Sequence, residues 1–529
     1  MAQRNTRRIA RSQKSPLPTS AAKLAEFGPV VQGAWFAAAA LALSFYLHFH
    51  SDKFPDPDIF YHFRHAALYA ANGPFDSEFP WARYSIIGQF AADIWYGFHV
   101  LLIPFVWLGD PLIGMRLAGV LVSAACLTLI YLVCLQLEIK AAPIWPFVML
   151  FSSAFLLHRL TMLRPHVLSL GLSVLILALL IAGRSRAVFL AAAALAWLHL
   201  SLFFVPLIVL GVFAATKLLT EKRFAWGGSL ALMGGLAAGW LLRPNPFGAA
   251  RIAYVQLFQW TSARLAGAPL EVGSELRPMT ITIHSNYLAF IVLLCLVLLL
   301  LLWKWHSGKS TLPIQARTSL SSAVILSLGF FLLAVLFARR AFDFASGFGT
   351  IMIALAFSHF FTGPKWLRIG SFGLFAVLAL YGISLRDRVL AIGWQADRMA
   401  SAAQWLEANS QAGDIVFNLR WEYFSELFFW NTKNRYIGGM DPIFQYAFDG
   451  ELYRAGLALG TPRNSLLCPT GACPEPGDAD SYRLLKDKFQ ARYVFLLKQA
   501  DANVFINLLN DKRFTLRYQD ENTALFEVL

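Results

Sequence analysis

A run of acidic, aromatic and basic residues follows the first apolar segment of the chain. It reads Asp56-Pro57-Asp58-Ile59-Phe60-Tyr61-His62-Phe63-Arg64. A carboxylate beside a basic residue at the edge of a membrane can act as a general base, bind a metal ion or orient an acceptor. The aromatic residues are typical of a loop that packs at the bilayer interface. The run therefore predicts a reactive site, and an ordinary solvated loop is the alternative.

Arginine and histidine residues in two later segments could hold a phosphate group. Arg164-Pro165-His166 follows His158-Arg159, and Arg339-Arg340 precedes a late apolar segment. Guanidinium groups bind phosphate oxygens directionally, and external arginines break the usual bias of basic residues toward the cytoplasm. The alternatives are cytoplasmic anchoring for the first segment, and pairing with lipid headgroups or Asp343 for the second.

Two further acidic groups are candidates for ligand contacts. Glu271 and Glu275 lie within Glu-Val-Gly-Ser-Glu-Leu-Arg-Pro, and Trp421-Glu422-Tyr423 follows a β-rich run. An acid between aromatic residues at the end of a strand can contact a ligand. The alternatives are an exposed loop acid for the first group and a packing role for the second.

The composition places the chain among multispanning membrane proteins. Of its 529 residues, 57% are hydrophobic, the mean hydropathy is +0.54, and only 14% are charged. Ordinary soluble proteins have about 25% charged residues. The formal net charge is +14, and its basic surplus lies within residues 1–388, as the positive-inside rule explains. Because no basic and aromatic motif for nucleic acids occurs, we expect no nucleic-acid partner.

Apolar segments and basic residues together predict about eleven spans in a membrane module over residues 1–388. Basic residues before the first segment place the N-terminus in the cytoplasm, which leaves external loops at 50–110 and 244–283. The stretch 93–109 is short and interrupted by polar residues, so we interpret it as an interfacial or re-entrant helix. The expected spans are 29–49, 111–137, 143–157, 166–183, a hairpin over 187–217 that bends near Trp197-Leu198-His199, 225–243, 284–303, 318–338, 345–361 and 366–384.

Residues 389–529 have the pattern of a soluble α/β domain, which this topology places on the external side. A helical pattern covers 394–409, and β-rich runs cover 415–418, 436–438, 493–497 and 514–518. Cys468 and Cys473 lie in this part, and an external location predicts a disulfide between them. The expected fold class is thus a polytopic α-helical protein of the inner (plasma) membrane with a C-terminal soluble α/β domain.

Taken in order, these segments resemble the catalytic subunit of oligosaccharyltransferase and, more broadly, the membrane glycosyltransferases of the C-type fold. That family has Asp-Pro-Trp-Phe-Asn-Tyr-Arg in its first external loop, and the run from Asp58 to Arg64 has the acid, the aromatics and the arginine at the same offsets. Its Ser-Val-Ser-Glu-type loop is similar to Val272-Gly273-Ser274-Glu275. Its Trp-Trp-Asp-Tyr-Gly motif is similar to Arg420-Trp421-Glu422-Tyr423-Phe424. Where the family has a second acidic motif, this chain has Arg164-Pro165-His166.

The resemblance implies an inverting glycosyltransferase that uses a polyprenyl-phosphate-linked sugar on the external face. The requirement for a divalent metal cofactor, Mg²⁺ or Mn²⁺, is left open, and Asp58 and His166 are its candidate ligands. The expected partners are the lipid-linked sugar, membrane lipids and a glycan, lipid or protein acceptor. The implied site residues are Asp58 and Glu275 for catalysis, with Asp58 as the general base; Arg164, His166, Arg339 and Arg340 for the donor phosphate; and Trp421, Glu422 and Tyr423 for the acceptor.

Three other functions fit parts of the same pattern. A polymerase or ligase of cell-envelope glycans differs only in its acceptor. A transporter or flippase of lipid-linked glycans would carry its charged residues within spans or around a midplane cavity, whereas here they concentrate in the external loops. A membrane scaffold whose soluble domain binds a partner needs no chemistry from Asp58.

Overall fold

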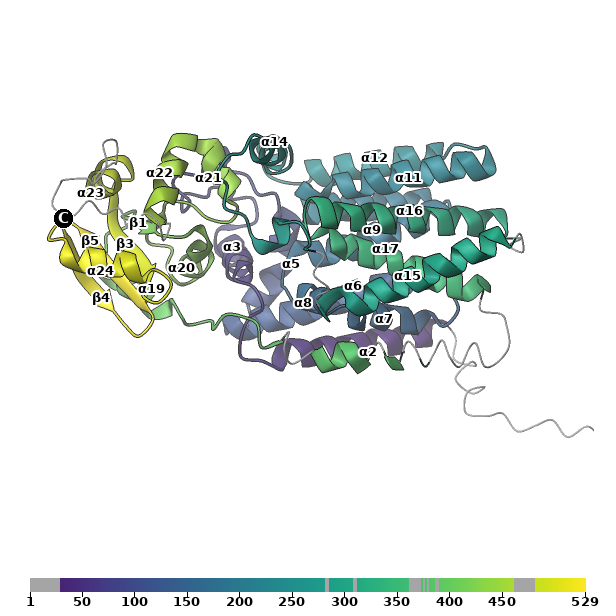
Figure 1. Cartoon of the computed structure of the whole chain (residues 1–529). Helices are drawn as coiled ribbons and strands as arrows, with labels where there is room; N and C mark the ends of the chain where they lie inside the picture. Colours follow the sequence, from purple (N-terminus) through teal and green to yellow (C-terminus); the bar gives the residue numbers. More distant parts are fainter. Residues whose placement is uncertain are drawn as a thin grey trace, which may run out of the picture.

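Long apolar runs form a bundle of helices that is joined at one end to a mixed α/β domain (Figure 1). The computed structural model describes residues 29–280, 285–307, 312–360, 373, 376–377, 380–385, 390–460 and 481–529. The bundle helices are α2 (Pro29–Phe49), α6 (Pro111–Gln136), α7 (Trp145–Phe151), α8 (Ala154–Leu160), α9 (Pro165–Ile181), α10 (Ser185–Leu198), α11 (Phe204–Glu221), α12 (Trp226–Leu241), α15 (Ser285–His306), α16 (Ile314–Leu336) and α17 (Ala341–Phe360).

Six helices in the described ranges are long and apolar enough to cross a membrane: α2, α6, α11, α15, α16 and α17. Helices α7 and α8 meet at 102° and would make a seventh span if they count as one. Helices α9 and α12 are shorter but lie beside the long helices α16 and α11 (Figure 1), and the short helix α10 packs against α9 and α12. With 17 residues, α9 is about 25 Å long, somewhat less than the hydrocarbon thickness of about 30 Å. The total of eleven spans stays a prediction.

Several finer features of the bundle agree with the sequence pattern. The segment 29–49 is helix α2, and the expected bend near His199 falls between α10 and α11. The ambiguous stretch 93–109 forms the 11-residue helix α5 (Tyr96–Val106), which is far too short to span a bilayer. The basic N-terminal segment, the cysteines Cys468 and Cys473, and most of the expected span 366–384 lie outside the described residues.

The loop 50–110 forms a structured layer between the bundle and the C-terminal domain. It holds α3 (Asp58–Asn72), α4 (Ile86–Phe90) and α5. The aromatic face of α3 is buried against α20 (Phe424–Trp430) of the C-terminal domain: the ring centroids of Phe60 and Phe429 are 5.3 Å apart. Two short β-bridges, Phe54 with Trp394 and Ala82 with Tyr436, add backbone links. These contacts fix the position of Asp58 at the start of α3.

The loop 244–283, which the sequence predicts to be external, is also anchored to the bundle. It contains α13 (Pro246–Tyr254), α14 (Trp260–Leu265) and the single turn Ser274–Leu276. The backbone N–H of Arg340 donates to the carbonyl of Glu275 at 3.0 Å, and that of Arg339 donates to Arg277 at 2.8 Å. Glu275 is therefore held against the start of α17.

The C-terminal domain contains one five-stranded sheet in the order β2-β1-β3-β5-β4. β1 pairs in parallel with β2 and β3, whereas β5 pairs antiparallel with β3 and β4. The pattern of 523–528 did not predict β5, because this interior strand is buried on both faces and lacks alternation. The elements are α19 (Ala400–Asn409), β1 (Ile415–Asn418), β2 (Arg435–Tyr436), α21 (Pro442–Phe448), α22 (Gly450–Gly460), α23 (Ser481–Arg483), β3 (Ala491–Leu497), α24 (Ala502–Asn510), β4 (Phe514–Gln519) and β5 (Thr523–Val528).

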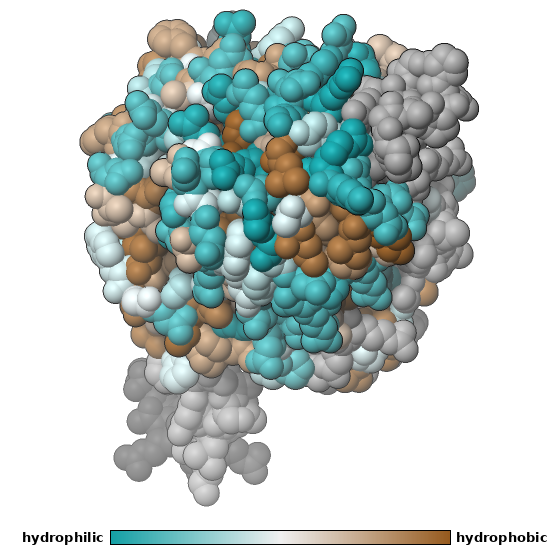
Figure 2. Space-filling model, turned by 90° about the vertical axis from the view of Figure 1, so that its left-hand side faces the viewer, coloured by the Kyte–Doolittle hydropathy of each residue, from teal (hydrophilic) through white to brown (hydrophobic). Residues whose placement is uncertain are grey.

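The two ends of the molecule differ in surface polarity. Seen from the end that the C-terminal domain forms, the surface is largely hydrophilic (Figure 2). The bundle helices instead expose large apolar side chains, such as Leu299, Trp303 and Trp305 of α15. Contiguous exposed apolar surface on long helices is typical of contact with lipid. The bundle therefore fits a bilayer, and the C-terminal domain fits an aqueous phase.

Replacement of Phe60 by alanine tests the α3–α20 junction. Phe60 is fully buried, so we expect Phe60→Ala to lower the free energy of unfolding by about 3–5 kcal/mol through cavity formation. Phe75→Ala is the control: this ring is 79% exposed on the same loop, and its loss should change stability by less than about 0.5 kcal/mol. Thermal unfolding in detergent measures both, and equal stability of the two variants would contradict the packing described for α3.

Candidate active site

A cavity of about 610 Å³ lies where the bundle meets the C-terminal domain. This volume is within the usual range of ligand sites. Its wall combines the start of α3, the segment before α9, the turn at Glu275, the start of α17 and residues 421–422 and 440–442 of the C-terminal domain. Most of the residues singled out in the sequence therefore face one space.

Arg164 lines the cavity, and its guanidinium contacts three carboxylates, those of Asp56, Asp58 and Glu275. Its Nε and Nη2 atoms donate to the two oxygens of Asp56, and Nη2 also lies 2.9 Å from Asp58 Oδ2. Its Nη1 donates to Glu275 Oε1 at 2.7 Å. The four side chains are between 4 and 22% exposed. Because three acids converge on one base in a mostly buried place, the cluster retains a net negative charge.

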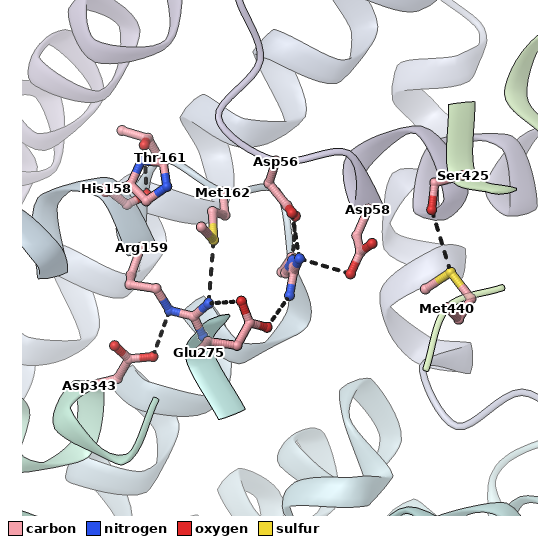
Figure 3. Close-up of polar contacts among 11 residues, drawn as sticks. Asp56, Asp58, His158, Arg159, Thr161, Met162, Glu275, Asp343, Ser425 and Met440 are labelled. Carbon is pink, nitrogen blue, oxygen red and sulfur yellow. Dashed lines mark hydrogen bonds and ion pairs between the residues drawn. The ribbon is translucent and has the colours of Figure 1, made fainter. Parts of the chain in front are cut away.

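A second arginine shares the Glu275 carboxylate. Arg159 Nη1 lies 3.6 Å from Glu275 Oε2, and Arg159 Nε donates to Asp343 Oδ2 at 3.1 Å (Figure 3). Burial by itself would raise the pKa of Glu275, but Arg164, Arg159 and Arg340 lower that pKa to about 2. Glu275 thus stays ionised and attracts the neighbouring guanidinium groups. A carboxylate with so low a pKa is a poor proton acceptor.

Asp58 has the opposite electrostatic balance. Burial raises its pKa to about 7, with smaller contributions from Asp56, Glu275 and Asp441, and Arg164 opposes the rise. In the described part of the chain, Asp58 Oδ1 has no hydrogen-bond partner, while Oδ2 faces Arg164. A carboxylate with a pKa near the working pH and a free oxygen at a cavity can accept a proton.

The structure separates the two arginines of the Arg339-Arg340 pair. Arg340 lines the cavity, and its guanidinium has no hydrogen bond or ion pair with any described residue. Arg339 instead donates through Nη2 to Ser274 Oγ at 2.8 Å and packs over the ring of Phe155. Only Arg340 is therefore available to an anion in the cavity. The alternative pairing of these arginines with Asp343 is wrong at the level of contact, since Asp343 bonds to Arg159.

Arg164 and His166 occupy different parts of the expected donor site. Arg164 is close to the cavity, but its guanidinium is saturated by carboxylates, so the expectation that it holds a phosphate does not fit its contacts. His166 lines the cavity, and its Nε2 atom is buried without a hydrogen-bond partner among the described residues.

The expected acceptor residues are also divided by the structure. Trp421 and Glu422 line the cavity. Tyr423 does not: it is buried, and its hydroxyl donates to Asp501 Oδ2 at 2.8 Å, beside the bond from Arg420 to the same carboxylate. The expectation that Tyr423 contacts an acceptor is therefore corrected to a packing role.

Sequence reasoning missed two residues of the cavity wall, Gln256 and Asp441, which offer hydrogen-bond acceptor atoms. Gln256 Nε2 donates to Asp441 Oδ2 at 3.2 Å, and both residues line the cavity. Gln256 Oε1 and Asp441 Oδ1 are buried without a partner among the described residues. Asp441 directly precedes α21 and belongs to no motif that would mark it as a site residue. Only the fold brings it near Asp58.

The residues of the cavity do not fit the expected divalent metal. The place that a cation would take among Asp56, Asp58 and Glu275 is taken by the guanidinium of Arg164. The predicted ligand pair of Asp58 and His166 lacks a third ligand among the described residues. Among the described residues, another group, His65, Asp93 and His99, has ligand atoms within 4.8 Å of one another, but Asp93 Oδ2 already accepts from the Tyr69 hydroxyl and from His99 Nδ1.

Comparisons with known proteins place the cavity in a known fold. No protein-family model matches the chain, and no curated protein matches it. Among solved structures, the chain is similar to the crystal structure of ArnT from Cupriavidus metallidurans in the apo state, with a TM-score of 0.54 and 11% sequence identity over 95% of this chain and 99% of that chain. The chain has the GT-C membrane glycosyltransferase fold. The fold expected from the sequence resemblance is thus confirmed.

Removal of the Arg164 side chain from this GT-C protein tests whether a guanidinium takes the place of a metal ion. Arg164→Ala leaves Asp56 and Asp58 without a base and Glu275 with Arg159 alone, so we expect a loss of about 3–5 kcal/mol in the free energy of unfolding. Mn²⁺ should then raise the melting temperature of Arg164→Ala and leave that of the wild type unchanged.

Arg340→Ala is the matched control, because it removes a guanidinium from the same cavity and leaves the carboxylates paired. Its stability should not depend on Mn²⁺. Equal stabilisation of the wild type and Arg164→Ala by Mn²⁺ would contradict the assignment of the cation position to Arg164.

Proposed function

We propose that this protein is an inverting glycosyltransferase that moves a sugar from a polyprenyl-phosphate-linked donor to an acceptor on the external face of the plasma membrane. One observation carries the proposal: a single cavity at the end of the bundle holds both Asp58, whose carboxylate can accept a proton, and Arg340, whose guanidinium has no ion-pair partner among the described residues. The GT-C fold supports the same reaction class.

Asp58 acts as the general base in this mechanism. Its free Oδ1 takes the proton of the acceptor hydroxyl, and the acceptor oxygen forms a bond to the anomeric carbon of the sugar. The bond between that carbon and the donor phosphate oxygen breaks on the opposite side, which inverts the configuration. Arg164 fixes the orientation of the carboxylate through Oδ2, so the base needs little reorganisation during the reaction.

Arg340 stabilises the charge that develops on the departing phosphate. It is the guanidinium of the cavity that carboxylates do not saturate, and a phosphate bound to arginine gains charge-assisted hydrogen bonds. His166 lies in the same wall and supplies a further polar contact for the donor. Arg340 directly precedes α17, which packs among the apolar helices, so a lipid tail can stay in the bilayer while its phosphate reaches the cavity.

Trp421 and Glu422 bind the acceptor on the side of the C-terminal domain. An indole offers an apolar face to a sugar ring or lipid, and the carboxylate accepts hydrogen bonds from hydroxyl groups. A glycan, a lipid or a protein side chain can all present such a hydroxyl. Divalent metal is not needed, because Arg164 supplies the positive charge among the acids.

The variant Asp58→Asn tests the assignment of the base. An amide cannot accept the proton, so we expect the rate of polyprenyl phosphate release to fall by about 10²–10⁴-fold. The assay uses protein in nanodiscs, radiolabelled polyprenyl-phosphate sugars and a membrane extract as the source of acceptor. Asp52→Asn, an exposed acid on the same loop, is the control and should keep full activity. Transport of the labelled lipid without cleavage of its sugar bond would favour the flippase alternative instead.

The pH dependence of the rate follows from the pKa of Asp58. Only the deprotonated carboxylate accepts a proton, so kcat should fall about tenfold per pH unit below a pH of about 7. Because Asp441 raises the pKa of Asp58, Asp441→Asn should move this acidic limb to lower pH. Arg340→Ala should lower the rate without moving the limb. An acidic limb that stays in place in Asp441→Asn would contradict the assignment of the limb to Asp58.

A further inference from the structure

Three buried side chains, Asp93, His99 and His62, are hydrogen-bonded in series, and the last of them lines the cavity. Asp93 precedes α5, His99 lies within α5, and His62 lies within α3. His99 Nδ1 and Asp93 Oδ2 are 2.6 Å apart, and His62 Nδ1 and His99 Nε2 are 2.8 Å apart. All three residues are at most 8% exposed. Short hydrogen bonds in a buried environment of low dielectric constant determine which atoms carry protons.

The direction of each hydrogen bond follows from the Asp93 end. Asp93 also accepts from the backbone N–H of Trp95 at 2.8 Å and from the hydroxyl of Tyr69 at 3.0 Å. A carboxylate with these donors stays ionised and accepts only. His99 must therefore carry a proton on Nδ1, and when this is its single ring proton, Nε2 is left as an acceptor. His62 must then donate from Nδ1, and its own Nε2 atom has no proton.

The unprotonated Nε2 atom of His62 ends this series of hydrogen bonds on the side of the cavity. His62 lines the cavity, and no described residue bonds to this nitrogen. His62 lies four residues after Asp58, so both side chains project from one face of α3. Burial, together with His99 and Arg164, lowers the pKa of His62 well below its ordinary value, so the ring is neutral and keeps its lone pair.

We propose that Asp93 and His99 hold His62 in the tautomer whose unprotonated Nε2 faces the cavity, and that this nitrogen accepts a hydrogen bond from a substrate hydroxyl beside Asp58. His62 is thus a binding and specificity-determining residue, and Asp93 and His99 are positioning residues that act through it. The role of the hydroxyl rests on the proposed function, whereas the tautomer does not. A substrate whose group at this place only accepts hydrogen bonds would be rejected.

The tautomer is measured by NMR of protein that carries ring-¹⁵N-labelled histidine, in detergent, with His62→Phe used to assign the His62 signals. In the wild type we expect a protonated Nδ1 and an unprotonated Nε2. In Asp93→Asn the amide can donate to His99, so both histidines should change tautomer and Nε2 of His62 should become protonated. Tyr69→Phe is the matched control: it removes one hydrogen bond from the same Asp93 oxygen and should leave both tautomers unchanged.

Transfer assays then test the role of this nitrogen. We expect His62→Phe and Asp93→Asn each to lower kcat/KM by roughly 10- to 100-fold, as mispairing of a buried polar group does. The double variant should lose no more than either single one, because Asp93 acts through His62. Tyr69→Phe should stay within about twofold of the wild type.

Several outcomes would overturn the proposal. These are a wild-type His62 that is protonated on Nε2, a reversed tautomer in Asp93→Asn with normal transfer, or one equivalent of metal bound to His65, Asp93 and His99 by elemental analysis. Normal transfer in Asp93→Asn together with loss in Asp58→Asn would remove the role of His62 and leave the proposed function intact. If the wild type releases no polyprenyl phosphate, the proposed function fails, and the NMR result alone decides the tautomer.

Discussion

The site depends on one interaction: the guanidinium of Arg164 holds together three carboxylates that come from two separate loops, 50–110 and 244–283. Buried acids repel one another, and a mostly buried carboxylate without a base would take up a proton or move to water. Arg164 removes that penalty for Asp56 and Glu275. The loop 50–110, the segment before α9 and the turn at Glu275 are thereby joined at one point.

The unequal distribution of positive charge around this point gives each acid a different role. Glu275 touches two arginines and stays ionised, whereas Asp58 faces only one side of Arg164 and has a pKa near neutrality. Arg340 lacks a carboxylate partner in the described ranges and is left for an anion. A second polar network, from Asp93 through His99 to His62, reaches the same cavity from behind α3. A carboxylate, a guanidinium and a histidine ring, each with polar atoms that have no partner among the described residues, thus surround one space.

The fold class and some elements could be predicted because their signals are local. The apolar run 29–49 is helix α2, the run 415–418 is β1, and the change at His199 is a real break between α10 and α11. The offsets from Asp58 to Arg64 single out Asp58 over Asp56, and Asp58 indeed has the free oxygen at the cavity. The buried strand β5 was missed because burial on both faces removes the alternation that marks a strand.

The sequence by itself indicated a multispanning membrane protein, because hydropathy and charge bias are properties of neighbouring residues. The order of its motifs carried the resemblance that implied the GT-C fold and candidate site residues in two loops. Only the tertiary structure decided which of these groups meet. Arg164 lies 108 residues from Asp56 and 111 from Glu275, and Asp441 and Gln256 approach the cavity from still other elements. It also decided that Tyr423 and Arg339 are engaged elsewhere, while Arg340 and His62 are not. Proton affinities and free hydrogen-bonding atoms depend on burial and on partners distant in the chain, and no local pattern encodes them.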